Sequence, residues 1–178
     1  MENKIQWCID QHVKTNHKYS EYLPYEFHLR MVVQAAEDFI HLFQPGPAFL
    51  ALSKEHIKLA CWGHDLIEDT RTSYNDIKHQ LGETSADIIY AVSNEKGKTR
   101  KERANDKYYE GIRNTDGAVF VKLCDRIANV QYSKMTKSRM FDMYKKENEN
   151  FTDQLGWRGL SNHPYASMFF YLQNLFNS

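Results

Sequence analysis

The chain has few of the features that mark secreted, membrane or nucleic-acid-binding proteins. Its 178 residues include only three cysteines, Cys8, Cys61 and Cys124, with no CxxC spacing. Such an odd, scattered set favours a reducing compartment over a disulfide framework. No apolar run suits a signal peptide or a membrane span. Basic and acidic residues number 23 each, so net charge favours neither nucleic acid nor a membrane surface. We therefore expect a soluble cytoplasmic protein that binds neither.

Helical periodicity is what the sequence does contain, and strand alternation is scarce. The length suits one domain, and no repeat or linker divides it. We expect an all-α, single-domain bundle of about eight helices over residues 1–178, with a last helix, 162–177, that packs on the rest. Ser53 and Ser73 are expected to cap two of the helices, and "QPGPA" at 44–48 is expected to end the first. The expected helices cover residues 24–43, 53–69, 74–81, 84–94, 97–114, 115–132, 138–156 and 162–177.

Several titratable side chains interrupt the apolar pattern of residues 61–70, "CWGHDLIEDT". His64 continues the apolar stripe of its expected helix, and Glu68 follows four residues later on the same face. Because burial of an isolated charge is costly, these side chains either face water or bind something. His28 and Asp125 stand in similarly apolar surroundings on two other expected helices. Histidine and carboxylate groups from three helices suit a divalent transition metal, which would neutralise the acids.

Each of these residues has a simpler interpretation when it is taken alone. A single buried His28 is more often a hydrogen-bonded core histidine than a ligand, and Asp125 beside Arg126 is typical of an ion pair. Cys61 and Cys124 are expected to be small buried hydrophobes. Only the combination favours a metal site. The remaining histidines are expected at surfaces or helix caps: His12, His17, His41, His56, His79 and His163.

Three motifs carry a family resemblance. The stretches "PYEFH", "HDLIEDT" and "VKLCDRIANV" resemble the motifs PY-x-x-H, HD-x-x-ED-T and VKLADRLxN of RelA/SpoT-type alarmone hydrolases, within the HD phosphohydrolase superfamily. The second and third motifs are specific together, whereas the first is weak alone. The resemblance covers about residues 15–150, and the length is similar to that of a stand-alone small alarmone hydrolase of the metazoan SpoT homologue kind.

The resemblance implies an HD-domain fold and a role for each matching residue. Glu68 and Asp69 would position or activate the attacking water, and Asn129 would contact the nucleotide. The ion would be manganese, with iron, zinc or magnesium as alternatives. Hydrolysis of phosphate esters needs a strong nucleophile, which a divalent metal and a nearby carboxylate supply together. Four residues would hold the ion: His28, His64, Asp65 and Asp125.

The implied substrates are guanosine tetra- and pentaphosphate. Family members remove the 3′-pyrophosphate, which would give GDP or GTP and pyrophosphate. Further cations should hold the leaving group, and the run "KGKTRKER" at 96–103 supplies several, with a solvated helix face as the alternative. Arg126 is expected to support the site through a carboxylate. The basic residues expected to contact the substrate are Lys98, Arg100, Arg103 and Lys122.

The segment "YSEYLPY" at 19–25 departs from the family pattern. Tyr19 and Ser20 replace a basic pair where the base should be gripped, which leaves guanine specificity open. Tyr19 or Tyr22 stacking on a purine is one alternative, and packing inside the protein is the other. Other open interpretations are an adenine alarmone, a 3′-phosphonucleotide or NADPH as substrate, and a catalytically silent nucleotide-binding regulator. An HD-GYP phosphodiesterase is disfavoured because Glu68 and Asp69 stand where it needs extra histidines. The oligomeric state stays open, a dimer being one alternative.

Overall fold

The protein is all-α, as the periodicity predicts. The computed structural model describes residues 1–43, 52–94, 96–159 and 161–177, and within them it has eleven α-helices, one 3-10 helix and no strand. Two of the α-helices, α4 and α7, are only four residues long. The other nine compare with about eight predicted from the sequence. The helix end that was predicted at residues 44–48 lies outside the described residues.

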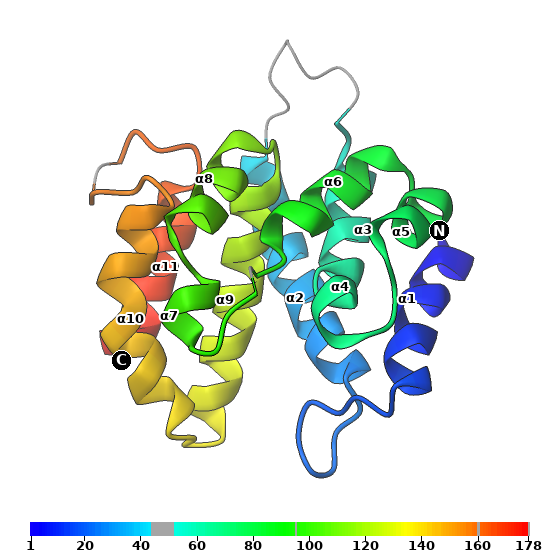
Figure 1. Cartoon of the computed structure of the whole chain (residues 1–178). Helices are drawn as coiled ribbons and strands as arrows, with labels where there is room; N and C mark the ends of the chain where they lie inside the picture. The colour runs from blue at the N-terminus through cyan, green and yellow to red at the C-terminus, as the bar shows by residue number, and fades with distance from the viewer. Residues whose placement is uncertain (44–51, 95, 160, 178) are drawn as a thin grey trace.

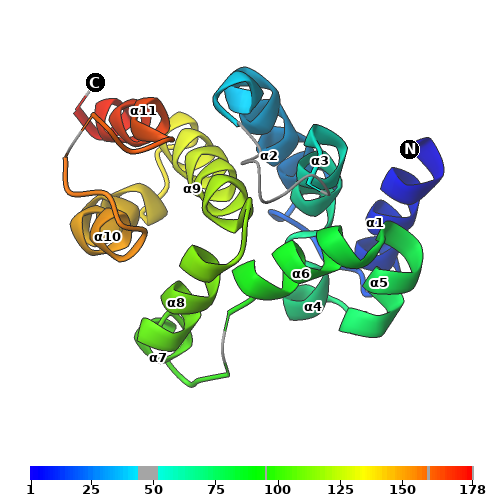
Figure 2. The same ribbon diagram turned by 90° about the horizontal axis from the view of Figure 1, so that it is seen from above.

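The longest helix lies in the middle of the molecule. Seen from above, α9 stands between α2 and α3 on one side and α10 and α11 on the other, while α1 and α5 lie at the far edge (Figures 1 and 2). Helix α11 packs against both α9 and α10. The elements in chain order are α1 (Glu2–Lys14), α2 (Glu26–Phe39), η1 (Ile40–Leu42), α3 (Lys54–Gly63), α4 (Leu66–Asp69), α5 (Tyr74–Leu81), α6 (Glu83–Val92), α7 (Arg100–Arg103), α8 (Asp106–Asn114), α9 (Ala118–Met135), α10 (Met140–Gln154) and α11 (Ala166–Asn177).

The two helix caps predicted from serines are confirmed. The Ser53 hydroxyl accepts the backbone N–H of His56, and the His56 ring accepts the N–H of Ser53, which closes a capping box at the start of α3. Ser73 and Asp76 form the same reciprocal pair at the start of α5. Each cap satisfies N–H groups that the helix itself leaves free, so a local signal was sufficient to predict both.

The helix expected over 97–114 is instead two helices. The Asn105 side chain accepts the N–H of Tyr108 at 3.0 Å and starts α8, which separates it from the single turn α7. The polar sequence of this region favours an exposed helix, but α8 is partly buried through Tyr108, Tyr109 and Ile112. Helix α1 was not predicted from the sequence at all.

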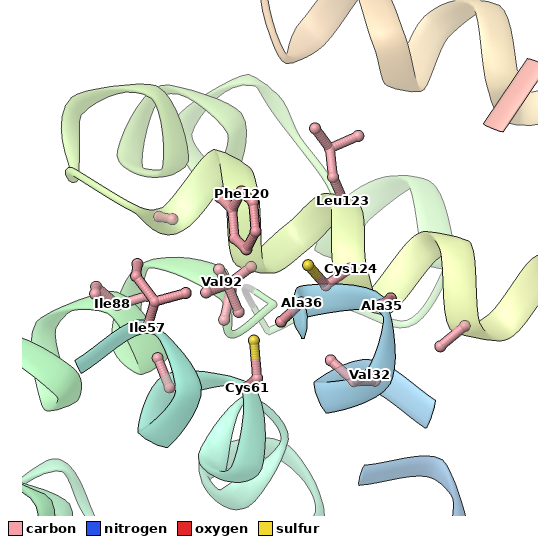
Figure 3. Packing of buried hydrophobic residues seen from close by; sticks show 14 of the residues in the cluster. Val32, Ala35, Ala36, Ile57, Cys61, Ile88, Val92, Phe120, Leu123 and Cys124 are labelled. Carbon is pink, nitrogen blue, oxygen red and sulfur yellow. The ribbon is translucent and has the colours of Figure 1, made fainter. Parts of the chain in front are cut away.

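The core surrounds α9 and contains all three cysteines. Figure 3 shows Cys61 from α3 and Cys124 from α9 among Val32, Ala36 and Phe120. Both cysteines are completely buried and free, which confirms that they are small buried hydrophobes. In the described part of the chain, no helix combines the length and the apolar character needed to cross a membrane.

His12 was predicted at a surface or a helix cap and is instead buried in α1, with 1% of its surface exposed. Its Nδ1 lies 3.1 Å from Nδ1 of His17. Its Nε2 has no hydrogen-bond partner among the described residues. Burial, which disfavours the charged imidazolium, lowers the pKa of His12 from 6.5 to about 3.

This lowered pKa predicts a pH-dependent stability. The unfolded chain binds the His12 proton more readily, so the contribution is complete above about pH 6.5 and is lost as the pH falls toward about 3. Between about pH 8 and about pH 5, wild-type protein should lose about 2 kcal/mol more unfolding free energy than a His12→Gln variant. Urea unfolding at both pH values measures the difference, in which the titrations common to both proteins cancel. Equal losses in the two proteins would contradict a neutral buried His12.

Candidate metal centre

Four side chains converge between α2, α9 and the junction of α3 with α4. Nε2 of His28 lies 3.2 Å from Nε2 of His64 and 3.6 Å from Oδ2 of Asp65. Nε2 of His64 lies 2.8 Å from the same Asp65 oxygen. Oδ1 of Asp125 lies 3.5 Å from Nε2 of His28 and 3.7 Å from Nε2 of His64. The structure therefore brings together the four residues that the sequence predicts as ligands.

A break in the helix lets the adjacent residues His64 and Asp65 reach the same place. Neighbouring residues of a continuous α-helix point about 100° apart. Here α3 ends at Gly63, and Asp65 has φ −103° and ψ 5°, outside the helical region, before α4 begins at Leu66. Gly63 permits the tight packing at this end, because a Cβ there would lie 2.6 Å from Cδ1 of Ile89. The single helix expected over 53–69 was therefore wrong, and the break helps to form the site.

The donor atoms fit a divalent cation. Nδ1 of His64 lies 3.0 Å from the Cys61 carbonyl oxygen, an acceptor, so this nitrogen carries a proton and Nε2 is the ring atom that faces the site. Nε2 lies 2.8 Å from Asp65 Oδ2, where a bound cation would take the place of the proton that Nε2 carries in the imidazolium. Ligands about 2.0–2.2 Å from one ion lie roughly 3–3.5 Å from each other, close to the separations found here. Among the described residues, His28, His64 and Asp65 form the one cluster compact enough to hold a metal.

The charges around the cluster also favour a cation. Burial lowers the pKa of His64, but the carboxylates of Asp65 and Asp125 outweigh it and hold the pKa well above its ordinary value. Burial raises the pKa of Asp125, but the Lys122 ammonium and the two histidines hold that pKa well below the usual range. Both acids are therefore anionic at neutral pH, and they attract positive charge to this point.

Asp125 is held in place from its own helix. Lys122 Nζ lies 3.0 Å from Oδ2, and Asn129 Nδ2 donates to Oδ1 at 2.5 Å. Residues 122, 125 and 129 are spaced three and four apart, so they share one face of α9. The "VKLCDRIANV" motif thus places a ligand and both of its supports on one helical face.

A cavity of about 510 Å³ adjoins the cluster. Three of the candidate ligands, His28, Asp65 and Asp125, line it. The sequence did not single out Asn94, Tyr144 or Lys146 for this site, and all three line the cavity. Tyr144 and Lys146 belong to α10, which carries none of the three motifs. The predicted substrate-binding residues that line it are Arg100, Arg103, Lys122 and Asn129.

Helix α10 also holds two of the basic side chains at the cavity wall. Glu147 accepts from Arg100 Nε at 2.7 Å and from Arg126 at 3.2 Å. The guanidinium carbons of Arg100 and Arg126 lie 5.5 Å and 4.7 Å from the centre of the Tyr144 ring. The prediction that Arg126 pairs with a carboxylate is confirmed. Sequence reasoning could not identify Glu147 as that carboxylate, because the pair joins separate helices.

Glu68 and Asp69 differ in their surroundings, and neither lines the cavity. The two oxygens of Glu68 accept the backbone N–H and the side-chain amide of Asn94, each at 2.7 Å. Asp69 Oδ2 lies 3.8 Å from His17 Nδ1. Burial, followed by the nearby charges of Asp65 and Glu68, raises the pKa of Asp69 to about 7. Glu68 is thus a fixed acceptor, and Asp69 is able to exchange a proton near neutral pH.

Three predicted substrate contacts lie outside the cavity lining: Tyr19, Ser20 and Lys98. The Tyr19 ring stacks on His28 with 4.7 Å between centroids, and its hydroxyl donates to Asn129 Oδ1 at 3.2 Å. The Ser20 hydroxyl accepts the N–H of Leu23 within its own turn. The Lys98 side chain is exposed. Contact of these three residues with a substrate stays a prediction.

Comparison with known proteins identifies the fold. No protein-family profile matches the sequence, and no curated protein does either. A solved structure of a metazoan ortholog of SpoT, which hydrolyzes ppGpp and plays a role in starvation responses, superimposes with a TM-score of 0.74 and 18% sequence identity. The match covers 99% of this chain and 93% of that one. This chain therefore has the all-helical fold of that SpoT ortholog, as the motif resemblance predicted.

Proposed function

We propose that this chain is a metal-dependent hydrolase that removes the 3′-pyrophosphate from guanosine tetra- and pentaphosphate. The observation that carries the proposal is the convergence of His28, His64, Asp65 and Asp125 beside a cavity with basic walls. The shared fold with a SpoT ortholog that hydrolyzes ppGpp supports it. Manganese is the proposed ion, because histidine and carboxylate donors accept it, and the proposed compartment is the cytoplasm.

The residues divide the reaction between them. When bound, a divalent ion supplies a Lewis acid that makes water more acidic and offsets phosphate charge. Asp69, a carboxylate on the short helix that follows Asp65, takes the proton of the attacking water. Glu68, fixed by Asn94, orients that water. The proton then leaves with the departing product or passes to solvent.

The basic side chains at the cavity bind the leaving pyrophosphate. Burial lowers the pKa of Lys122, but the nearby carboxylates, Asp125 among them, oppose it, and the pKa stays well above its ordinary value, so Lys122 is cationic. Arg100 and Arg126 are pre-positioned by Glu147, so little side-chain freedom is lost when they meet a phosphate. The GDP or GTP product lacks the 3′ charges and binds these cations less strongly.

The decisive experiment incubates manganese-loaded protein with ppGpp and measures pyrophosphate and phosphate separately. Release of pyrophosphate with formation of GDP, abolished by a chelator and restored by Mn²⁺, is the expected result. Intact ppGpp in the presence of bound metal would contradict the proposed substrate. Protein that takes up no metal after soaking in Mn²⁺ would instead support a silent regulatory module. Elemental analysis of protein as purified distinguishes manganese from iron and zinc.

The arrangement of Tyr19 calls for a wider set of nucleotides in the same assay. Its ring is packed on His28 and its hydroxyl is bonded to Asn129, so it supplies no cation to grip guanine. The panel therefore includes an adenine alarmone, a 3′-phosphonucleotide and NADPH. A higher kcat/KM on one of these than on ppGpp would make that nucleotide the proposed substrate and leave the proposed metal site unchanged.

Replacing Asp69 by asparagine tests the proposed proton acceptor. Asparagine keeps the size but cannot take a proton, so kcat should fall by about 10²- to 10⁴-fold, while Mn²⁺ affinity changes little. Asp153→Asn is the matched control, because Asp153 is an exposed residue of α10. Steady-state kinetics at saturating Mn²⁺ measures both variants. An Asp69→Asn enzyme with wild-type kcat would assign proton acceptance to another group.

A further inference from the structure

Tyr25 connects the candidate metal centre to the N-terminal helix. The residue lies at the start of α2 and is 8% exposed. Its hydroxyl donates a hydrogen bond to Oδ2 of Asp65, the oxygen that faces both His28 and His64. Among the described residues, no side chain other than those two histidines and Tyr25 contacts the Asp65 carboxylate through a hydrogen bond or ion pair. Tyr25 is therefore the residue that holds the Asp65 carboxylate without being a candidate metal ligand itself.

Two histidines pack against the ring of Tyr25. His17 stacks on it with 3.9 Å between ring centroids and an interplanar angle of 24°, and His12 stacks at 4.4 Å and 26°. The two histidines are joined by their Nδ1 atoms, 3.1 Å apart. His12 is on α1 and His17 lies just after that helix. Neither belongs to the three motifs that predicted the site.

We infer that Tyr25 is a positioning residue of the metal centre, and that His12 and His17 hold its ring so that the hydroxyl stays on Asp65. Hydrogen bonds to a metal ligand fix its orientation, and their loss typically costs about 10- to 100-fold in metal affinity or activity. Because Asp65 sits in a break between two helices, it lacks partners like Lys122 and Asn129, which hold Asp125 from three and four residues away on α9. Helix α1 thereby becomes part of the centre. The inference rests on the proposed function only for its effect on turnover.

Tyr25→Phe tests the contribution of the Tyr25 hydroxyl separately from that of the ring. Phenylalanine keeps the stacking surface for both histidines and removes the hydroxyl, which donates to Asp65 and also interacts with Asp69. We expect Mn²⁺ affinity, measured by calorimetric titration without nucleotide, to fall by about 10- to 100-fold. In the hydrolysis assay at saturating Mn²⁺, kcat should fall while KM for the nucleotide stays within about twofold of wild type. Tyr165→Phe is the matched control, since the Tyr165 ring packs against Phe120 and His163. A Tyr25→Phe protein with wild-type Mn²⁺ affinity would overturn the inference.

The proposed support of the Tyr25 ring by His12 and His17 is tested at His17, the less buried of the two histidines, with 27% of its side chain exposed. His17→Phe keeps a ring against Tyr25, whereas His17→Ala removes it. We expect the alanine variant to lose Mn²⁺ affinity by about tenfold and the phenylalanine variant to retain it. Wild-type Mn²⁺ affinity in His17→Ala, or equal losses of affinity in both variants, would overturn the role of His17 in holding the Tyr25 ring. If ppGpp is not hydrolysed but Tyr25→Phe still weakens Mn²⁺ binding, the positioning role stands and the proposed function fails.

Discussion

Replacing His64 by alanine is expected to remove stoichiometric Mn²⁺ binding and to lower nucleotide hydrolysis by a factor on the order of 10³. His64 is 1% exposed, and its Nε2 lies within 3.7 Å of a donor atom from each of the other three candidate ligands. Its loss takes one ligand from the ion and removes the imidazole that lies beside both half-buried carboxylates, so that their mutual repulsion is less well compensated. Elemental analysis after dialysis and ppGpp turnover measure the two effects.

A thermal shift provides a second readout for the same variant. Mn²⁺ at about 100 times its dissociation constant should stabilise wild-type protein by about 2.7 kcal/mol. For a protein of this size that shift corresponds to roughly 5 to 10 °C in Tm. His64→Ala should show no such shift, and His79→Ala should behave as wild type because His79 is exposed on α5. His64→Ala protein that still binds one Mn²⁺ per chain would place the metal elsewhere.

Phe120→Ala is expected to have the largest effect on stability, about 3–5 kcal/mol. Phe120 is completely buried on α9, and its ring packs against Phe43 and Tyr165 (Figure 3 shows its place in the core). Alanine loses the transfer free energy of the ring and leaves a cavity that the surrounding helices fill only in part. Urea unfolding measured at neutral pH gives the free energy of unfolding of both proteins.

The matched control is Phe170→Ala on α11. Phe170 is 41% exposed, so the same change should cost about 1 kcal/mol or less. Because α9 also carries Lys122, Asp125 and Asn129, any movement of the helix in Phe120→Ala should lower Mn²⁺ affinity as well. Equal costs for the two variants would contradict the placement of Phe120 at the centre of the core.

The features predicted well from the sequence depend on neighbours within about four residues along the chain. The Ser53 and Ser73 caps are of this kind. The contacts of Lys122 and Asn129 with Asp125 are equally local, although the sequence analysis did not predict them. Such hydrogen bonds follow from helical spacing alone. Three of the candidate ligands, His28, His64 and Asp125, were proposed because acids and histidines in apolar surroundings need a partner, whereas the motif resemblance added Asp65.

The sequence was a weaker guide where local and distant contacts compete. Residues 97–114 read as one polar helix, but the Asn105 cap divides them, and Tyr108 and Tyr109 are buried against the rest of the molecule. His12 reads as a surface residue and is instead packed behind Tyr25. In both cases, packing against residues far away in the chain decided which side chains were buried.

The sequence by itself determined the all-helical class, the chemical types of the candidate ligands and the helices that carry most of them. The tertiary structure alone decided the supports around those ligands. Glu147 reaches Arg100 and Arg126, Asn94 reaches Glu68, and Tyr25 reaches Asp65. These pairs are 21 to 47 residues apart. Helical periodicity carries no information about contacts at such separations, because they depend on how whole helices pack around α9.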